Sequence, residues 1–257
     1  MNDSGLQFDP FDARTGLDAI EGAYVQRLLQ PLHRGPMLEM VRDAMLKISS
    51  GWRGQFPEWQ VRNLALASSV TNTAKARYVV DSSKTAVRLK YLLRIDNLDV
   101  KVVRLVRDGR AVALTYMDAS NYADASDPSL RGGGSGMQVH DRLSMTEAAM
   151  LWKRSNQEAE EVLRTVPPDA QIRIAYEDLC TNTDQVLASV HNLLGLSHSD
   201  SYRNFRKVPH HVIGNGMRLD STSEIRLDDR WKQVLNEQEL AEFDRVCGSM
   251  NAMYGYD

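Results

Sequence analysis

Apolar residues recur every three or four positions in the first quarter of the chain, and this spacing predicts amphipathic helices between about residues 17 and 69. One predicted apolar face carries Ile20, Tyr24, Leu28 and Leu29, and a second carries Met37, Met40, Val41, Met45 and Ile48. Residues 51–57 interrupt the pattern, and residues 59–66 resume it. We expect both faces to pack against other parts of the chain, because an amphipathic helix buries its apolar stripe.

Three short runs of β-branched and aromatic residues follow a different pattern. Residues 78–84 read Tyr-Val-Val-Asp-Ser-Ser-Lys, residues 102–106 read Val-Val-Arg-Leu-Val, and residues 172–176 read Ile-Arg-Ile-Ala-Tyr. Continuous apolar runs that stop at small polar residues predict strands buried on both faces of a parallel sheet. A helix predicted over residues 85–95 separates the first two, which gives the strand, helix, strand order of a right-handed parallel unit.

The later helices carry clear start and stop signals. Ser144 and the glutamate three residues later form a capping box, which predicts a helix as far as residue 165. A helix over residues 184–194 is expected to stop at Gly195. Asn236 and the glutamate three residues later begin the last predicted helix.

Length and composition place the chain among globular α/β proteins. Its 257 residues, 42% hydrophobic and 25% charged, predict a single domain rather than a disordered or fibrous chain. A net charge of −3 gives no electrostatic reason to expect a nucleic-acid partner. The two cysteines, Cys180 and Cys247, lie far apart and predict neither disulfides nor a metal site. No apolar run is long enough to span a membrane, so we expect a cytoplasmic protein.

Polar and cationic residues follow two of the predicted strands. Ser82, Ser83 and Lys84 end the first, and Arg107 follows the second. Ligands of parallel sheets bind beyond the carboxyl ends of the strands, so these groups predict an anion site at one edge. Thr115, eight residues after Arg107 on the next predicted helix, could reach the same phosphate.

Each of these residues also has an ordinary structural interpretation. Arg107 could pair with Asp108 at the surface, Lys84 could be a solvated cation at a helix start, and Tyr176 could be a core residue. The glycine-rich residues 131–136 are interpreted as a surface loop, because a phosphate-binding loop needs a preceding strand and a following Lys-Ser or Lys-Thr. His211, one of two adjacent histidines, is more typical of a structural residue than of a general base.

Several motifs, in one order along residues 78–256, resemble those of sulfotransferases that use 3′-phosphoadenosine 5′-phosphosulfate (PAPS). The matches are Val-Asp-Ser-Ser-Lys at 80–84, Leu-Val-Arg-Asp-x-Arg-Ala-Val-Ala at 105–113, Tyr-Glu-Asp-Leu at 176–179, His-x-Ile-Gly-Asn at 211–215 with Arg218, and the terminal Tyr-Gly-Tyr at 254–256. Ala175 stands where the family usually has arginine. The resemblance implies a three-layer α/β fold, with helices on both faces of a parallel sheet, of the P-loop nucleoside-triphosphate-hydrolase-like type.

The resemblance also implies roles for individual residues. Arg107 would bind the 3′-phosphate of PAPS, with Thr115 supplying the hydroxyl that a serine supplies in the family. Tyr176 would lie against the adenine or ribose, and Arg218 would close over a nucleotide phosphate. Lys84 would lie near the sulfuryl group and stabilise the charge that accumulates on the bridging oxygen. No metal is implied.

The remaining segments are assigned to the acceptor. Residues 1–76 form a helical region on the acceptor side of the single domain, and the loop over 118–144 would line the same pocket. The acceptor would be a small molecule or a carbohydrate with a hydroxyl or amine group. A homodimer is left open.

One signature of the family is not recognisable, namely the Gly-x-x-Arg-Ser-Gly-Thr-Thr loop that wraps the 5′-phosphosulfate. Residues 13–17, Ala-Arg-Thr-Gly-Leu, are its nearest match, and no buried strand precedes them. The sheet would then lack its first strand. We weigh three explanations: a truncated start, a strand supplied by a second chain, or a catalytically inactive relative that binds adenosine 3′,5′-bisphosphate or a protein partner. A kinase relative is disfavoured, since no Gly-Lys-Ser or Gly-Lys-Thr loop exists.

Overall fold

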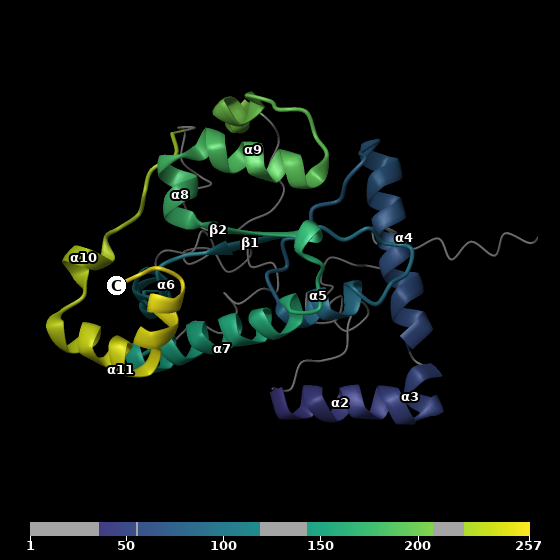
Figure 1. Ribbon diagram of the computed structural model, residues 1–257, viewed down its shortest axis with the longest axis horizontal. Helices are drawn as coiled ribbons and strands as arrows, with labels where there is room; N and C mark the ends of the chain where they lie inside the picture. The colour runs from purple at the N-terminus through teal and green to yellow at the C-terminus, as the bar shows by residue number, and fades with distance from the viewer. Residues whose placement is uncertain (1–35, 55, 119–142, 208–223) are drawn as a thin grey trace, which may run out of the picture. The chain divides into compact units, whose positions relative to one another are not determined.

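The computed structural model describes residues 36–54, 56–118, 143–207 and 224–257 (Figure 1). The chain divides into two compact units, Met1–Val100 and Lys101–Asp257. The first contains only helices among its described elements, and the second contains a small parallel sheet with helices around it. Whether the two units act as one domain, as the sequence predicts, stays a prediction.

The helical first quarter is confirmed where it is described. Helices α2 (Pro36–Ile48), α3 (Ser50–Gly54) and α4 (Phe56–Ala74) follow one another, and α5 (Ala86–Leu92) comes after a segment without helix or strand. Leu46, Val87 and Tyr91 form the buried cluster of this unit, and the ring of Trp59 packs edge-on against Tyr91 at 5.8 Å. The expected interruption is shorter than predicted, because residues 51–54 are helical.

Helix α2 does not bury the face that its apolar residues predict. Its exposed side chains are Met37, Met40, Val41 and Ile48. The buried positions are instead Leu46 and Glu39, and the carboxylate of Glu39 contacts Arg42 and lies 3.1 Å from Lys90. Charged pairing allows a carboxylate to be buried, so the polar side of α2 faces α5 and the predicted packing face is wrong.

Residues 78–85 do not form the first predicted strand. They belong to no helix or strand, and Val80 is 87% exposed. A β-branched run becomes a strand only when a neighbouring strand accepts its backbone hydrogen bonds. In the described part of the chain the sheet consists of β1 and β2 alone, so the predicted right-handed unit built on residues 78–106 is wrong here.

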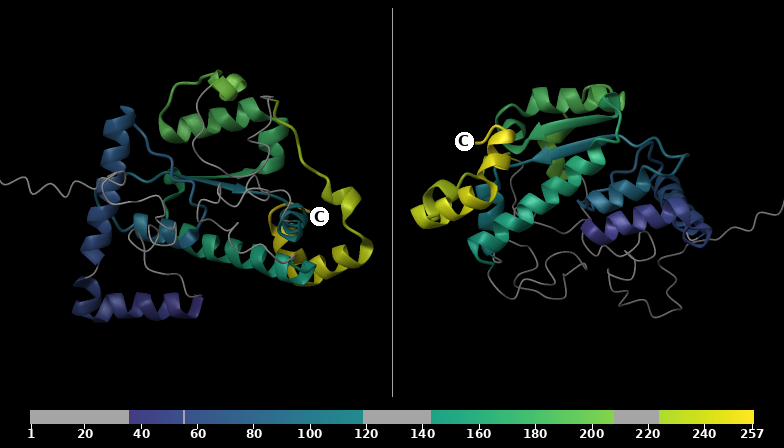
Figure 2. Two further views of the ribbon diagram at one scale, coloured as in Figure 1. Left: turned by 180° about the vertical axis from the view of Figure 1, so that it is seen from behind. Right: turned by 60° about the horizontal axis from the view of Figure 1, so that its bottom comes forward.

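The second and third predicted strands are confirmed and pair in parallel. Strand β1 (Val102–Val106) lies beside β2 (Gln171–Ala175), with Val102 opposite Gln171 and Val106 opposite Ala175. Helices α6 (Gly109–Met117) and α7 (Met145–Leu163) lie between the two strands in the sequence. Figures 1 and 2 show α7 on one side of the sheet and α9 (Thr183–Leu194) on the other.

Burial on both faces is not confirmed for β1. Val103 is 43% and Leu105 is 52% exposed, whereas Val106 is buried. Helix α7 covers the face that carries Arg104, and α9 packs against β2, so one side of β1 has no helix over it among the described elements. The α/β class and the parallel pairing are therefore confirmed, and the full three-layer sheet stays a prediction.

The predicted helix signals are confirmed. Capping boxes begin α7 at Ser144 and α11 (Glu237–Met253) at Asn236, and Gly195 ends α9 with a left-handed backbone, φ 61°. The remaining short elements are η4 (Pro168–Ala170), α8 (Tyr176–Thr181), η5 (Ser201–Lys207) and α10 (Trp231–Val234). None of the helices in the described ranges has the length and hydropathy that a membrane crossing requires.

The core of the second unit fixes the start of α6. Helices α6, α7 and α11 pack around Trp152 and Phe243, whose rings lie 6.0 Å apart. A Cβ atom at Gly109 would lie 2.5 Å from Cζ of Phe243 and 3.0 Å from Trp152. Glycine is needed at this position because the backbone of α6 lies directly against these two rings.

Candidate anion site at the ends of β1 and β2

Arg107 and Tyr176 are brought together by the parallel pairing of the strands. Arg107 directly follows β1, and Tyr176 directly follows β2 as the first residue of α8. The guanidinium carbon of Arg107 lies 4.4 Å from the centroid of the Tyr176 ring, within the range of a cation–π contact. Two of the residues predicted to bind the nucleotide are therefore neighbours at one edge of the sheet.

Arg107 is held by an aspartate that sequence reasoning did not identify. Its Nη2 donates a 2.5 Å hydrogen bond to the backbone carbonyl of Asp228 and lies 3.0 Å from the carboxylate of the same residue. Its Nε is buried, and in the described ranges it has no hydrogen-bond partner. The guanidinium thus retains one donor to satisfy, and its charge faces a carboxylate.

Asp228 is fixed by contacts on both sides. The hydroxyl of Tyr176 accepts a 3.2 Å hydrogen bond from its backbone N–H, and Arg230 donates to its carboxylate from Nε at 2.7 Å and Nη2 at 3.0 Å. The hydrogen bond from Arg230, and then that from Arg107, lower the pKa of Asp228 against the opposing effect of burial. Asp228 is therefore ionised at neutral pH, and its charge faces the guanidinium of Arg107.

Asp108 does not pair with Arg107, so the surface ion pair considered for these two residues is wrong. Asp108 is buried, and its carboxylate accepts from the backbone N–H of Arg110 at 2.9 Å, which caps α6. The guanidinium of Arg110 also pairs with Asp108 at 2.8 Å and lies over the Trp231 ring at 4.1 Å. Arg107 is thereby left free to point toward the segment around Asp228.

Thr115 lies on α6, as predicted. Its side chain is half-buried, and its hydroxyl donates to the carbonyl of Ala111 at 3.1 Å. Such a bond inside a helix leaves the oxygen able to accept from, or to be turned toward, another group. Its partnership with Arg107 at a phosphate stays a prediction.

Lys84 belongs to the first unit and lies two residues before the start of α5. It is exposed, and its φ of 63° is in the left-handed region, which is unusual for a residue with a side chain. Asp81 anchors the preceding turn, since its carboxylate accepts from the Ser83 N–H at 2.9 Å and pairs with Arg88 at 3.0 Å. Burial would raise the pKa of Asp81, but the hydrogen bonds from Ser83 and the charge of Arg88 lower it.

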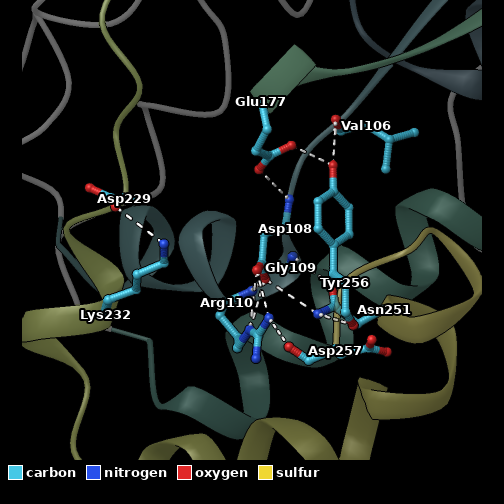
Figure 3. A network of polar contacts seen from close by, with 10 residues as sticks. All are labelled: Val106, Asp108, Gly109, Arg110, Glu177, Asp229, Lys232, Asn251, Tyr256 and Asp257. Atoms are coloured by element: carbon cyan, nitrogen blue, oxygen red, sulfur yellow. Dashed lines mark hydrogen bonds and ion pairs between the residues drawn. The ribbon is translucent and has the colours of Figure 1, made fainter. Parts of the chain in front are cut away.

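A second polar cluster supports the end of β1 (Figure 3). Glu177, the neighbour of Tyr176, accepts a 3.2 Å hydrogen bond from the Asp108 N–H through Oε1. Its Oε2 accepts a 2.5 Å hydrogen bond from the hydroxyl of Tyr256, which also lies 3.3 Å from the Val106 carbonyl. The carboxyl-terminal Tyr-Gly-Tyr segment is thus joined to both strand ends.

Several predicted residues lie outside the described residues. They are Arg218 and His211, the loop over 131–136, and residues 13–17. Asp228 is a residue that the sequence alone did not reveal, because its pairing with Arg107 depends on contact between distant segments. In the described ranges, no three His, Cys, Asp or Glu residues are grouped as metal ligands.

Comparisons with known proteins give one family match and two structural matches. Residues 28–200 match the profile of the sulfotransferase family. No curated protein sequence gives a significant match. Two solved structures are similar: the sulfotransferase domain from the curacin biosynthetic pathway, and the sulfotransferase domain from the Synechococcus PCC 7002 olefin synthase.

The first of these structures has a TM-score of 0.51 and 18% identity, covering 88% of this chain and 82% of that chain. The second has a TM-score of 0.56 and 17% identity, covering 92% and 81%. At such low identity the likeness concerns the fold, and it extends over most of each chain.

Proposed function

The chain belongs to the sulfotransferase family, and from that premise we propose that it transfers a sulfuryl group from PAPS to a hydroxyl or amine of an acceptor. Membership in this family indicates that the reaction is the transfer of a sulfuryl group. The identity of the donor and the residues that hold it are the proposal, and the alternative is an inactive relative that still binds adenosine 3′,5′-bisphosphate.

The observation that carries the proposal is the environment of Arg107. Its guanidinium lies at the end of a parallel strand, over an aromatic ring, with a buried Nε that has no partner among the described residues. A buried donor without a partner costs about 1–3 kcal/mol, and a phosphate oxygen would remove that cost. The arrangement therefore suits the 3′-phosphate, the group that distinguishes PAPS from common adenine nucleotides.

The other assigned residues take complementary roles. Tyr176 would present its ring to the adenine or ribose, and Thr115 would offer a hydroxyl to the phosphate held by Arg107. Arg218 would contact a second nucleotide phosphate. PAPS, when bound, supplies the sulfuryl group, and Lys84 would stabilise the negative charge that develops as that group leaves. For Arg218 and Lys84 the support is their place in the sequence motifs.

The acceptor is proposed in general terms. We expect a small molecule or a carbohydrate rather than a nucleic acid, because the net charge of the chain is −3. Both similar structures come from biosynthetic systems, named for curacin and for an olefin synthase. A cytoplasmic location and a homodimer stay predictions from the sequence.

Calorimetric titration with adenosine 3′,5′-bisphosphate tests the nucleotide site. We expect Arg107→Ala to weaken binding by at least about tenfold, since a charge-assisted hydrogen bond contributes about 1.5–3 kcal/mol. Arg203→Ala is the matched control, because Arg203 also lies over a tyrosine, Tyr202, at 5.3 Å and pairs with an aspartate, Asp184, at 2.9 Å. Binding that is absent, or equally affected by both variants, rejects the assignment.

Transfer of labelled sulfate from PAPS then separates an enzyme from an inactive relative. An active chain gives labelled product with a panel of alcohol, phenol, sugar and amine acceptors. A chain that binds adenosine 3′,5′-bisphosphate but transfers no label to any member of the panel supports the inactive relative.

A further inference from the structure

The two peptide groups that flank Arg107 each contact one of two side chains, Tyr256 and Glu177. The carbonyl of Val106, on one side, lies 3.3 Å from the hydroxyl of Tyr256. The N–H of Asp108, on the other side, donates to Oε1 of Glu177 at 3.2 Å. These two contacts fix the backbone immediately before and after Arg107, and so restrict the direction in which its side chain leaves the strand.

Glu177 and Tyr256 also contact each other. The Tyr256 hydroxyl has one proton, and the 2.5 Å distance to Oε2 of Glu177 shows that the carboxylate receives it. The Val106 carbonyl is the weaker partner of the same proton. Burial and the hydrogen bond to Glu177 raise the pKa of Tyr256, which keeps the hydroxyl protonated and able to donate. Glu177 therefore holds Tyr256 and the Asp108 backbone at the same time.

The carboxyl-terminal segment is itself anchored to the start of α6. Asn251, which is 2% exposed, accepts from the Gly109 N–H at 2.8 Å through Oδ1, and its Nδ2 lies 3.3 Å from the Tyr256 carbonyl. Arg110 donates to the Asp257 carbonyl at 2.8 Å. Figure 3 shows these contacts converging on the turn between β1 and α6. Tyr256 is thus rigidly placed relative to the turn that it contacts.

Glu177 connects the backbone around Arg107 to Tyr176, the other residue proposed to bind the nucleotide. It follows Tyr176 in the sequence, so the side chain that holds the backbone around Arg107 comes from the segment that carries the aromatic ring. We propose that Glu177 and Tyr256 form a clamp that positions Arg107 over Tyr176 for the 3′-phosphate. The clamp rests on the proposed function, and its two residues act through Arg107 without touching the nucleotide themselves.

A clamp of this kind is distinguished from a general structural contact by its effect on selectivity. Adenosine 3′,5′-bisphosphate and adenosine 5′-monophosphate differ only in the 3′-phosphate. We define the selectivity as the ratio of the two dissociation constants measured by calorimetry, monophosphate over bisphosphate. A loss of general structure weakens both nucleotides, whereas a misplaced Arg107 weakens the bisphosphate alone.

The test uses Tyr256→Phe, which removes one hydroxyl and keeps the ring. We expect the selectivity to fall at least about fivefold, since the variant loses one hydrogen bond that orients a charge-assisted contact. Tyr254→Phe is the matched control. Tyr254 comes two residues before Tyr256 in the sequence, and its hydroxyl contacts Glu160 and Arg104 instead. That variant should leave the selectivity unchanged.

A double mutant identifies the route of the effect. In an Arg107→Ala background the further change Tyr256→Phe should not alter the selectivity, because residues that act through one group are not additive. Glu177→Gln is the second variant. The glutamine keeps one acceptor oxygen for two donors, the Asp108 N–H and the Tyr256 hydroxyl. One of the two hydrogen bonds is therefore lost, and we expect the selectivity to fall at least about twofold. If near-ultraviolet circular dichroism shows that Tyr256→Phe does not fold, the selectivity of Glu177→Gln tests the clamp in its place.

The outcomes separate the clamp from the nucleotide site. A wild-type chain without preference for the bisphosphate overturns the 3′-phosphate site and the clamp with it. A wild-type preference that the folded Tyr256→Phe and Glu177→Gln variants both retain overturns the clamp alone. A loss of selectivity that persists in the Arg107→Ala background shows that the two residues act by another route, and also overturns the clamp.

Discussion

The guanidinium of Arg107 lies over the ring of Tyr176, with 4.4 Å between its carbon and the ring centroid. The contact exists because Val106 and Ala175, the last residues of two parallel strands, are partners in register. The residues that follow the two strands, Arg107 and Tyr176, therefore lie at the same edge of the sheet. Under the proposed function, the cation at this edge would contact a phosphate and the aromatic face would contact a base.

The ring of Tyr176 matters more to this contact than its hydroxyl. We expect Tyr176→Phe to bind adenosine 3′,5′-bisphosphate within about threefold of wild type, and Tyr176→Leu to bind about tenfold more weakly, since a partly buried cation–π contact contributes about 1–2 kcal/mol. Calorimetry measures both. Tyr202→Leu, which removes the ring beneath Arg203, is the control. Equal affinities of the Phe and Leu variants contradict a role for the ring.

Asp228 pairs with Arg107, so under the proposed function it would compete with an anionic ligand for the guanidinium. Replacing Asp228 with Asn removes the negative charge and keeps the side-chain shape, so we expect about three- to tenfold tighter binding of adenosine 3′,5′-bisphosphate, from an ion pair of about 1 kcal/mol. Asp229→Asn is the matched control, since Asp229 pairs only weakly with Lys232, at 3.3 Å. Weaker binding by Asp228→Asn would show that Asp228 orients Arg107 rather than competing for it.

The same carboxylate links stability to pH. The pKa of Asp228 is lower in the folded chain than its usual value of 3.8, first because of the hydrogen bond from Arg230 and then because of Arg107. Its contribution to the free energy of unfolding is therefore complete above about pH 5 and is lost as the pH falls through the unfolded value toward the lower folded one.

Urea unfolding at several pH values checks this dependence. Wild type should be more stable than Asp228→Asn by about 2 kcal/mol at pH 7, in the range of hydrogen bonds to charged groups. The difference should shrink steadily between pH 5 and pH 3, because Asp228 takes up a proton in the unfolded chain over this range while it stays ionised in the folded chain. A difference that stays constant over this interval rules out ionised Asp228 as its source.

Sequence reasoning succeeded where local signals decide the structure. Ser144, Asn236 and Gly195 begin or end helices through hydrogen bonds and backbone preferences within a few residues, and all three are confirmed. Arg107 and Tyr176 were also predictable as neighbours, since residues that follow parallel strands share one edge.

It failed where the outcome depends on distant partners. Val80 belongs to a run that is typical of a strand, yet no strand pairs with it in the described part of the chain. The apolar side of α2 was expected to be buried, but the ion pairs of Glu39 with α5 turn the helix the other way. Asp228 was overlooked because pairing between separate segments leaves no spacing pattern in the sequence.

A substitution at Lys84 can separate an effect on the rate of sulfate transfer from an effect on the stability of the fold. Its left-handed backbone costs about 1 kcal/mol for a residue with a side chain, and glycine removes that cost. We expect Lys84→Gly to melt at the wild-type temperature or slightly above, and to transfer labelled sulfate about a hundredfold more slowly, the effect of one electrostatic group. Lys75→Gly is the control, because Lys75 also has a positive φ, 49°. An unchanged transfer rate in Lys84→Gly rejects its catalytic role.

Gly109 tests whether the packing beneath α6 supports the site. A Cβ atom there would lie 2.5 Å from the ring of Phe243, which is fully buried. We expect Gly109→Ala to lower the free energy of unfolding by about 1–3 kcal/mol, as overpacking of a core does. Guanidinium unfolding followed by tryptophan fluorescence measures the change.

Gly248→Ala provides the opposite case in the same unit. A Cβ atom at Gly248, inside α11, would lie 3.5 Å from Asp244 in ordinary contact, so this change should stabilise the chain by about 0.5–1 kcal/mol through helix propensity. Phe243→Leu should restore part of the stability lost in Gly109→Ala, because the smaller side chain relieves the overlap. If Gly109→Ala were as stable as Gly248→Ala, the turn after Arg107 could shift to accommodate the methyl group. The close packing of α6 would then not be what holds Arg107 in place.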